Sequence, residues 1–193
     1  MTVYGQGKLL VISGPSAGVG KDTVMQLFLK QNPDWMAPIS TTTRPARRDE
    51  IDGKNMHFVS LAEFQRLKSE GKFLEAFMVN NQWYGTLRGP VEEALKNGKN
   101  VILRKDVQGA LAIKKALPSA ITIFIRAESD EALEQRLRSR ATEKPTEIEK
   151  RLRLAKQELL SVSLFDHLVV NPSGHPEKDF DDLTSVVGGL NSS

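Results

Sequence analysis

Short apolar runs along the chain alternate with segments in which apolar residues recur at helical spacing. Four runs have the length of buried strands: Lys8–Ser13, Asn100–Lys105, Ala120–Ile125 and His167–Asn171. Each run is followed by a segment of helical periodicity, and these segments are Lys21–Gln31, Val107–Leu117, Ser129–Arg140 and Pro176–Val187. Repetition of strand and helix in this order predicts an α/β fold in which a parallel sheet carries helices on both faces.

The pattern changes between Ile39 and Gly89. In this segment the chain consists of short alternating pieces and turn sequences such as IDGKN, at residues 51–55. The sequence shows no internal repeat, low-complexity tract or flexible linker that would mark a separate domain. We therefore expect a small α+β lobe inserted into the α/β core.

The composition is that of an ordinary globular protein. The chain has 193 residues, 39% of them hydrophobic and 26% charged, which suits one core with small inserted lobes. The absence of cysteine excludes disulfides and thiolate metal sites and fits a reducing compartment. The longest apolar run near the start, LLVI, is too short for a secretory signal or a membrane span. We expect a cytoplasmic protein with no membrane partner.

The charge of the chain is mildly basic, with a formal net charge of +3. Arginines gather in RPARR, at residues 44–48, and in RLRSR, at residues 136–140. Few aromatic residues are interleaved with these arginines, although a nucleic-acid groove would use them to stack bases. The charge pattern therefore favours a compact phosphate site and no nucleic-acid partner.

The stretch GPSAGVGKDT, from Gly14 to Thr23, lies between the first predicted strand and the first predicted helix. It is close to the phosphate-loop pattern G-x-x-x-x-G-K-[ST], in which backbone N–H groups and a lysine cradle phosphates. The N-terminus of the following helix directs amide donors and a positive dipole end at an anion. A simple turn would not require three glycines followed by lysine. We predict a nucleotide site in which Lys21 is a solvent-accessible cation between the β- and γ-phosphates.

Two features of this stretch depart from the phosphate-loop pattern. Five residues, rather than four, separate Gly14 from Gly20, and we interpret Ala17 as the insertion. Asp22 occupies the position after the lysine where a hydroxyl is expected, and a carboxylate repels polyphosphate unless a cation lies between them. Magnesium can be that cation, which makes Asp22 the candidate metal ligand, while Thr23 still offers a hydroxyl to a phosphate.

Four further stretches closely resemble the guanylate kinase family, in the order and spacing of that family. They are STTTRPARRDEIDGKNMHFVS at residues 40–60, FLEAFMVNNQWYGT at 73–86, VILRKDVQGA at 101–110 and RLRSRATEKPTEIEKRL at 136–152. The resemblance covers nearly the whole chain. It implies a P-loop kinase that transfers phosphate from ATP to GMP with Mg²⁺, with a five-stranded parallel core, an acceptor-binding lobe and a lid.

The resemblance also implies roles for individual residues. The ATP contacts come from the whole loop: Gly14, Pro15, Ser16, Ala17, Gly18, Val19, Gly20, Lys21, Asp22 and Thr23. The GMP contacts are Ser40, Arg44, Arg47, Glu50, Glu75, Tyr84, Thr86 and Asp106. The cations that act on the transferring group are Lys21, Arg44, Arg136, Arg140 and Arg151. Because GMP carries its own anionic nucleophile, the reaction needs positioning and charge neutralisation rather than a general base.

Particular residue types suit these roles. The planar guanidinium of Arg44 or Arg47 can bind phosphate oxygens with two hydrogen bonds, although the arginines from Arg136 to Arg151 also fit a solvated helix face. Guanine presents a ring N–H beside an exocyclic amine, and one carboxylate, Glu75, can accept both hydrogen bonds. The alternative for Glu75 is an exposed position on a strand. Ser40 and Thr86 would meet the other edge of the base.

Two other positions depart from the family pattern. Met56 stands where a tyrosine is common, and Arg104 replaces the first acid of an acidic pair whose second acid is Asp106. Arg104 removes one possible metal-binding carboxylate. It can offset the charge of Asp22 if the end of its strand lies beside the loop.

The predicted organisation has three parts. Residues 1–38, 90–130 and 161–193 form the P-loop core, residues 39–89 form the GMP-binding lobe, and residues 131–160 form the lid. We expect a monomer or small homo-oligomer. Two alternatives remain: a related sugar-bisphosphate kinase, in which an acid also follows the loop lysine, or a guanylate-kinase-like module that binds peptides without turnover.

Overall fold

The structure is a computed structural model and describes residues 7–15, 19–79, 81–139 and 145–171. The predicted helix Pro176–Val187 and the candidate residues Ser16, Ala17, Gly18 and Arg140 lie outside these residues. The described part divides into two compact units. The first contains residues 7–9, 34–79, 81–103 and 112–120, and the second contains residues 10–15, 19–33, 104–111, 121–139 and 145–171.

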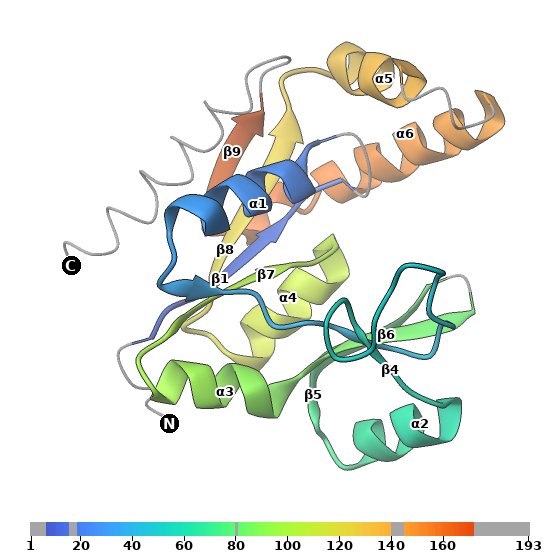
Figure 1. The fold of residues 1–193 in the computed structure, drawn as a ribbon. Helices are drawn as coiled ribbons and strands as arrows, with labels where there is room; N and C mark the ends of the chain where they lie inside the picture. The colour runs from blue at the N-terminus through green and yellow to red at the C-terminus, as the bar shows by residue number, and fades with distance from the viewer. Residues whose placement is uncertain (1–6, 16–18, 80, 140–144, 172–193) are drawn as a thin grey trace. The chain divides into compact units, whose positions relative to one another are not determined.

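Five strands form one sheet in the order β2-β7-β1-β8-β9. Figure 1 shows β1, β8 and β9 of the second unit side by side. Their bounds are β1 Leu9–Ser13, β2 Trp35–Met36, β7 Asn100–Arg104, β8 Ile121–Ala127 and β9 His167–Asn171. β8 pairs in parallel with both β1 and β9, and β2 pairs in parallel with β7. These pairings confirm the predicted α/β fold with a five-stranded parallel sheet. The prediction succeeded because strands that are buried on both faces appear in the sequence as continuous apolar runs.

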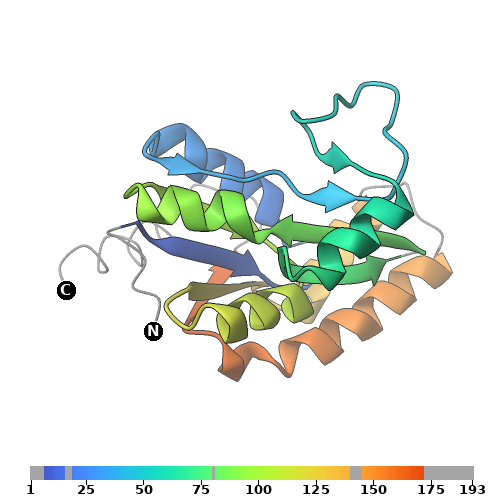
Figure 2. The same cartoon turned by 90° about the horizontal axis from the view of Figure 1, so that it is seen from below.

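The helices of the second unit each bury one apolar stripe. They are α1 Lys21–Gln31, α5 Asp130–Ser139 and α6 Pro145–Leu159, and the short 3₁₀ helix η1 Val162–Leu164 follows them. α1 buries Val24 and Phe28, as the periodicity predicts. α5 contacts α6 and β8, and Figure 2 shows α6 as the long helix of this unit. A further helix, α4 Val107–Ala116, has residues in both units.

The first unit contains a second sheet with strand order β4-β3-β6-β5. Its strands are β3 Thr41–Thr42, β4 His57–Phe58, β5 Phe73–Val79 and β6 Gln82–Leu87, and its helices are α2 Leu61–Ser69 and α3 Arg88–Lys96. β3 is parallel to β4 and antiparallel to β6, which is antiparallel to β5. Figure 2 shows the connection between β3 and β4 as an excursion that leaves this sheet and returns to it. The segment is α+β, as predicted.

The pairing of β5 with β6 is irregular at one point. The register shifts between Phe73 and Glu75, so that Glu75 lies opposite Thr86. A Cβ on Gly85 would lie 2.7 Å from a ring carbon of Phe73, so a side chain there would prevent this close approach. The irregularity breaks the alternation of the strand, and Phe73, Leu74 and Glu75 are all buried.

Helix α2 packs against the second sheet. Its N-cap is Ser60, whose hydroxyl accepts a hydrogen bond from the Glu63 N–H at 3.1 Å. Phe64, on the buried side of the helix, stacks on Phe73 with ring centroids 4.5 Å apart and on Trp83 at 5.6 Å. Among the helices that the structure describes, none is long and apolar enough to cross a membrane.

Candidate functional site

The phosphate loop leaves β1 and enters α1 through two glycines with positive φ, 140° at Gly14 and 77° at Gly20. A Cβ on Gly14 would lie 2.0 Å from the carbonyl oxygen of Ile125 on β8. At the other end, the side chain of Asn171 on β9 donates a hydrogen bond to the carbonyl oxygen of Val19 at 3.0 Å. Gly14 therefore leaves no room for a side chain beside β8, β9 holds the other end of the loop through Asn171, and the positive φ angles favour glycine at both positions.

Lys21, the first residue of α1, is buried, with 8% of its surface exposed. Its ammonium group donates hydrogen bonds to the carbonyl oxygens of Gly14, at 3.2 Å, and of Pro15. Burial lowers the pKa of Lys21 to about 8, and the positive charge of Arg104 adds to this effect. Three carboxylates act in the opposite direction, those of Glu158, Asp22 and Asp106. The prediction that Lys21 is accessible to solvent is therefore wrong, because its side chain folds back onto the carbonyl groups of its own loop.

Asp22 and Arg104 form an ion pair beside Lys21. Arg104, the last residue of β7, places its Nε 2.9 Å from Oδ1 of Asp22, and its Nη1 donates to Oδ2 at 3.4 Å. Both side chains are largely exposed, 46% for Arg104 and 70% for Asp22. The prediction that Arg104 lies close enough to offset the charge of Asp22 is confirmed.

The arginines of the predicted lid differ in their surroundings. Arg136 on α5 donates a hydrogen bond from Nη2 to the carbonyl oxygen of Asn171 at 2.7 Å, and it lies 3.8 Å from a carboxylate oxygen of Glu128. Arg151 lies on the exposed surface of α6. Asn171 therefore connects Arg136 to the phosphate loop, since its side chain holds Val19 and its carbonyl group holds Arg136.

In the first unit, the predicted acceptor lobe contains a buried carboxylate, Glu75 on β5. Glu75 is 7% exposed, and the Thr86 hydroxyl donates a hydrogen bond to its Oε1 at 2.6 Å. Thr86 is itself buried on β6. A buried carboxylate is costly unless its oxygens are hydrogen-bonded. The alternative of an exposed strand position is therefore wrong, because the register shift turns Glu75 inward.

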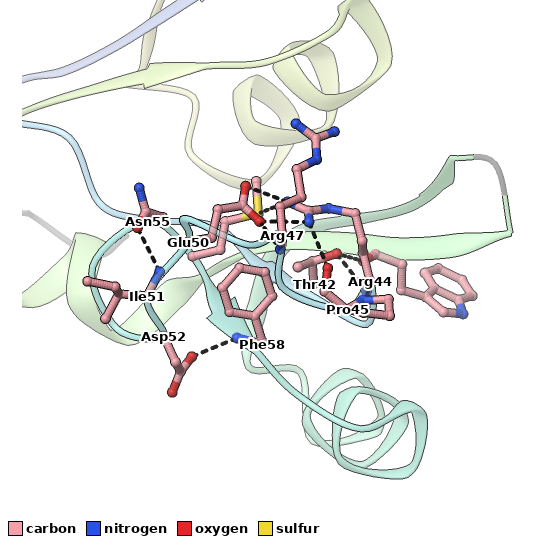
Figure 3. Close-up of polar contacts among 11 residues, drawn as sticks. Thr42, Arg44, Pro45, Arg47, Glu50, Ile51, Asp52, Asn55 and Phe58 are labelled. Atoms are coloured by element: carbon pink, nitrogen blue, oxygen red, sulfur yellow. Dashed lines mark hydrogen bonds and ion pairs between the residues drawn. The ribbon is translucent and has the colours of Figure 1, made fainter.

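Arg44 and Glu50 form a second polar group in the same unit (Figure 3). Two guanidinium nitrogens of Arg44 donate to the two oxygens of Glu50 at 2.8 and 2.9 Å, and the backbone N–H of Arg47 also donates to Glu50 at 2.8 Å. Hydrogen bonding to Arg44 lowers the pKa of Glu50 to about 2. Figure 3 shows the guanidinium of Arg47 directed away from this pair.

Two further residues discussed from the sequence, Tyr84 and Met56, interact with Arg44, and a third, Asp106, precedes α4. A hydrogen bond with Glu50 is the main reason that the pKa of Arg44 is raised, and a hydrogen bond with Tyr84 adds to it. The sulfur of Met56, where a tyrosine is common, lies 3.7 Å from Nη2 of Arg44. Asp106 in the second unit accepts a hydrogen bond from the Gly109 N–H at 2.7 Å, which is the geometry of a helix N-cap.

The family model for guanylate kinase matches residues 6–187 of this chain. The chain belongs to the guanylate kinase family. It is 47% identical to a guanylate kinase of Synechocystis over 86% of this chain and 86% of that protein. It is 40% identical to a guanylate kinase of Carboxydothermus hydrogenoformans over 96% of this chain and 86% of that protein. The crystal structure of guanylate kinase from Anaplasma phagocytophilum matches with a TM-score of 0.73 and 29% identity, covering 95% of this chain and 86% of that chain.

The structure groups the candidate residues of this guanylate kinase family member in two sets. Lys21, Asp22, Asp106, Arg136 and Arg151 belong to the second unit, whereas the other candidates that the structure describes in residues 40–86 belong to the first. Sequence reasoning did not single out Asn171. The available signal was an amide side chain at the carboxyl end of a predicted parallel strand, which is where such sheets bind ligands.

Proposed function

We infer that this chain is a guanylate kinase, which transfers the γ-phosphoryl group of ATP to GMP and releases ADP and GDP. The observation that carries this conclusion is the family match over residues 6–187, which spans both the phosphate loop and the second sheet. The buried carboxylate of Glu75 in the second sheet also supports this conclusion, because a carboxylate can accept the hydrogen bonds that guanine donates.

The reaction is a direct in-line phosphoryl transfer. An oxygen of the GMP phosphate forms a bond to the γ-phosphorus as the bond from that phosphorus to the oxygen bridging it to the β-phosphate breaks. The attacking oxygen is already anionic, so no proton has to be removed. The protein must instead hold two polyanions together and neutralise their charge. Although Asp22 after the loop lysine is shared with the sugar-bisphosphate alternative, the similar proteins reported above are named guanylate kinases.

The individual roles are part of the proposal. Residues 14–23 hold ATP, with Lys21 turning from its loop carbonyls to the phosphates. Arg136, Arg140 and Arg151 neutralise the transferring group from a lid at residues 131–160. The GMP-binding lobe, residues 39–89, holds the base through Ser40, Glu75 and Thr86 and the acceptor phosphate through Arg44, Arg47 and Tyr84, with Glu50 orienting Arg44. The remaining segments, 1–38, 90–130 and 161–193, form the core. A cytoplasmic location, a monomeric or small homo-oligomeric state and the absence of nucleic-acid and membrane partners complete the proposal.

Magnesium is proposed to arrive with ATP. Among the described residues no group of three or more histidine, aspartate or glutamate side chains is arranged to hold a metal ion. This fits Mg²⁺, which proteins commonly bind through one or two carboxylates and substrate phosphates. The exposed carboxylate of Asp22 on the first turn of α1 would be the protein ligand. Bound there, the ion would neutralise charge on the β- and γ-phosphates.

A coupled assay of ADP formation tests the function. We expect turnover with ATP and GMP, and much lower turnover when AMP or a sugar bisphosphate replaces GMP. ADP formation with a sugar bisphosphate alone would indicate the related kinase. A folded protein that binds a nucleotide or peptide without any turnover would indicate the binding module.

Glu50 is expected to position Arg44 for the acceptor phosphate. Replacement of Glu50 by glutamine substitutes an amide donor for one of the two acceptors that hold the guanidinium. We expect KM for GMP to rise by about fivefold to fiftyfold with a smaller fall in kcat, because an orienting interaction is lost. Steady-state kinetics measure both quantities. Glu63→Gln, which breaks an exposed pair with Arg66 on α2, serves as the control and should leave both unchanged. An unchanged KM in Glu50→Gln would contradict the role.

The low pKa of Lys21 predicts proton uptake on ATP binding in mildly alkaline solution. The free chain loses the Lys21 proton as pH rises through about 8. Bound triphosphate stabilises the ammonium form and raises this pKa, so binding above pH 8 takes up a proton. Calorimetry in buffers of different ionisation enthalpy measures the uptake, which should vanish in Lys21→Met. A wild-type binding enthalpy that is independent of buffer at pH 8.5 would contradict this prediction.

A further inference from the structure

The Asp22–Arg104 pair joins two departures from the family pattern. Asp22 places a carboxylate where a hydroxyl is expected, and Arg104 places a guanidinium where an acid is expected. The two residues are 82 positions apart in the sequence, yet Nε of Arg104 lies 2.9 Å from Oδ1 of Asp22. The pair therefore joins a carboxylate on the first turn of α1 to a guanidinium at the end of β7.

The position of the pair beside Lys21 gives it an electrostatic effect on the loop. Asp22 directly follows Lys21, and the charges of both Asp22 and Arg104 act on the Lys21 ammonium group with opposite signs. Without Arg104, the Asp22 carboxylate would repel the triphosphate of an ATP molecule bound at the loop, because like charges that are close together repel strongly. With Arg104 in contact, the two charges largely cancel. Because both side chains are exposed, the pair stabilises the fold little and its partners can exchange readily.

We propose that Arg104 is a positioning residue of the donor site, which holds the Asp22 carboxylate and cancels its charge so that the loop can bind ATP before a metal ion is present. The proposal rests on the proposed function, since it assigns the loop to ATP. It separates nucleotide binding, which Arg104 allows without metal, from phosphoryl transfer, which still requires magnesium. It also explains why the chain can carry an aspartate after the loop lysine.

Equilibrium binding of ATP to the full chain, measured by calorimetry in EDTA and in saturating magnesium, tests the proposal. Arg104→Glu places a second carboxylate beside Asp22 and should weaken metal-free ATP binding by about tenfold or more. Asp22→Ser leaves the positive charge of Arg104 without its carboxylate partner and should tighten metal-free ATP binding by about fivefold. The double variant should return to within about threefold of wild type, and saturating magnesium should shrink the difference between Arg104→Glu and wild type, because the bound cation offsets the added negative charge.

Arg66→Gln is the matched control, because it removes one positive charge from an exposed ion pair on α2. It should leave ATP binding unchanged. Metal-free affinities within twofold of wild type for either single variant, or shifts of the two variants in the same direction, would overturn the proposal. If the wild-type chain binds magnesium–ATP in such a case, only this inference fails. A wild-type chain that does not bind magnesium–ATP would instead overturn the proposed function, and this inference with it.

Discussion

Replacement of Lys21 by alanine is expected to lower kcat for GDP formation by about a hundredfold to a thousandfold. The substitution removes the positive charge that we propose stabilises the transferring phosphoryl group, and single preorganised donors contribute at this scale. Because Lys21 also pays a desolvation cost in the free chain, its removal should leave the protein folded. The coupled ADP assay measures kcat, and circular dichroism with retained GMP binding establishes the folded state.

Lys30 provides the matched control for Lys21. It is exposed in the last turn of the same helix, so Lys30→Ala changes the same residue type without touching the loop. Turnover of this variant should stay close to wild type. Near-normal turnover of a folded Lys21→Ala protein would exclude the loop as the donor site.

Replacement of Glu75 by glutamine is expected to reduce kcat/KM for GMP by about tenfold to a thousandfold. An amide that accepts one guanine hydrogen bond presents a donor to the other guanine N–H, and an unmatched buried polar group is costly. The Thr86 hydroxyl, 2.6 Å from Oε1, fixes the rotamer of Glu75, so Thr86→Val should weaken GMP use in the same direction with a smaller effect. Binding of ATP should barely change in either variant.

Glu70→Gln is the corresponding control for the acceptor lobe. Glu70 is a glutamate of the same unit, exposed and paired with Arg66 at 2.6 Å. Its substitution should leave GMP kinetics unchanged. Unaffected GMP kinetics in Glu75→Gln, or equal use of AMP and GMP by the wild type, would refute the assignment of Glu75 to the base.

Sequence periodicity predicts the elements of the parallel sheet closely. The run Lys8–Ser13 corresponds to β1 Leu9–Ser13, and the helical spacing of Lys21–Gln31 corresponds to α1. Long buried elements repeat their pattern often enough to be recognised. β2 is too short to show any period. The first turn of α3 contains Gly89 and Pro90, a pair that is typical of a turn rather than of a helix. Proline is nevertheless tolerated in the first turn of a helix, because the N–H groups there have no helical partners.

Local alternation predicts the wrong orientation for Glu75. In a regular strand successive side chains point to opposite faces, and a charged residue between apolar neighbours is expected on the exposed one. The register shift beside Glu75 buries three consecutive residues of β5. Such a shift depends on the partner strand, here on the space that Gly85 leaves for Phe73.

By itself the sequence determined the fold class, the phosphate loop and the family, because these depend on apolar runs and on motifs of residues close along the chain. The sequence suggested the pairing of Arg104 with Asp22 only on the condition that the strand end lies beside the loop, and the tertiary structure decided this contact across 82 residues. The tertiary structure alone revealed that Asn171 holds Val19 across 152 residues. The burial of Lys21 likewise depends on how its side chain folds back onto the loop. Contacts of this kind follow from the order and register of the strands, which no local pattern of residues encodes.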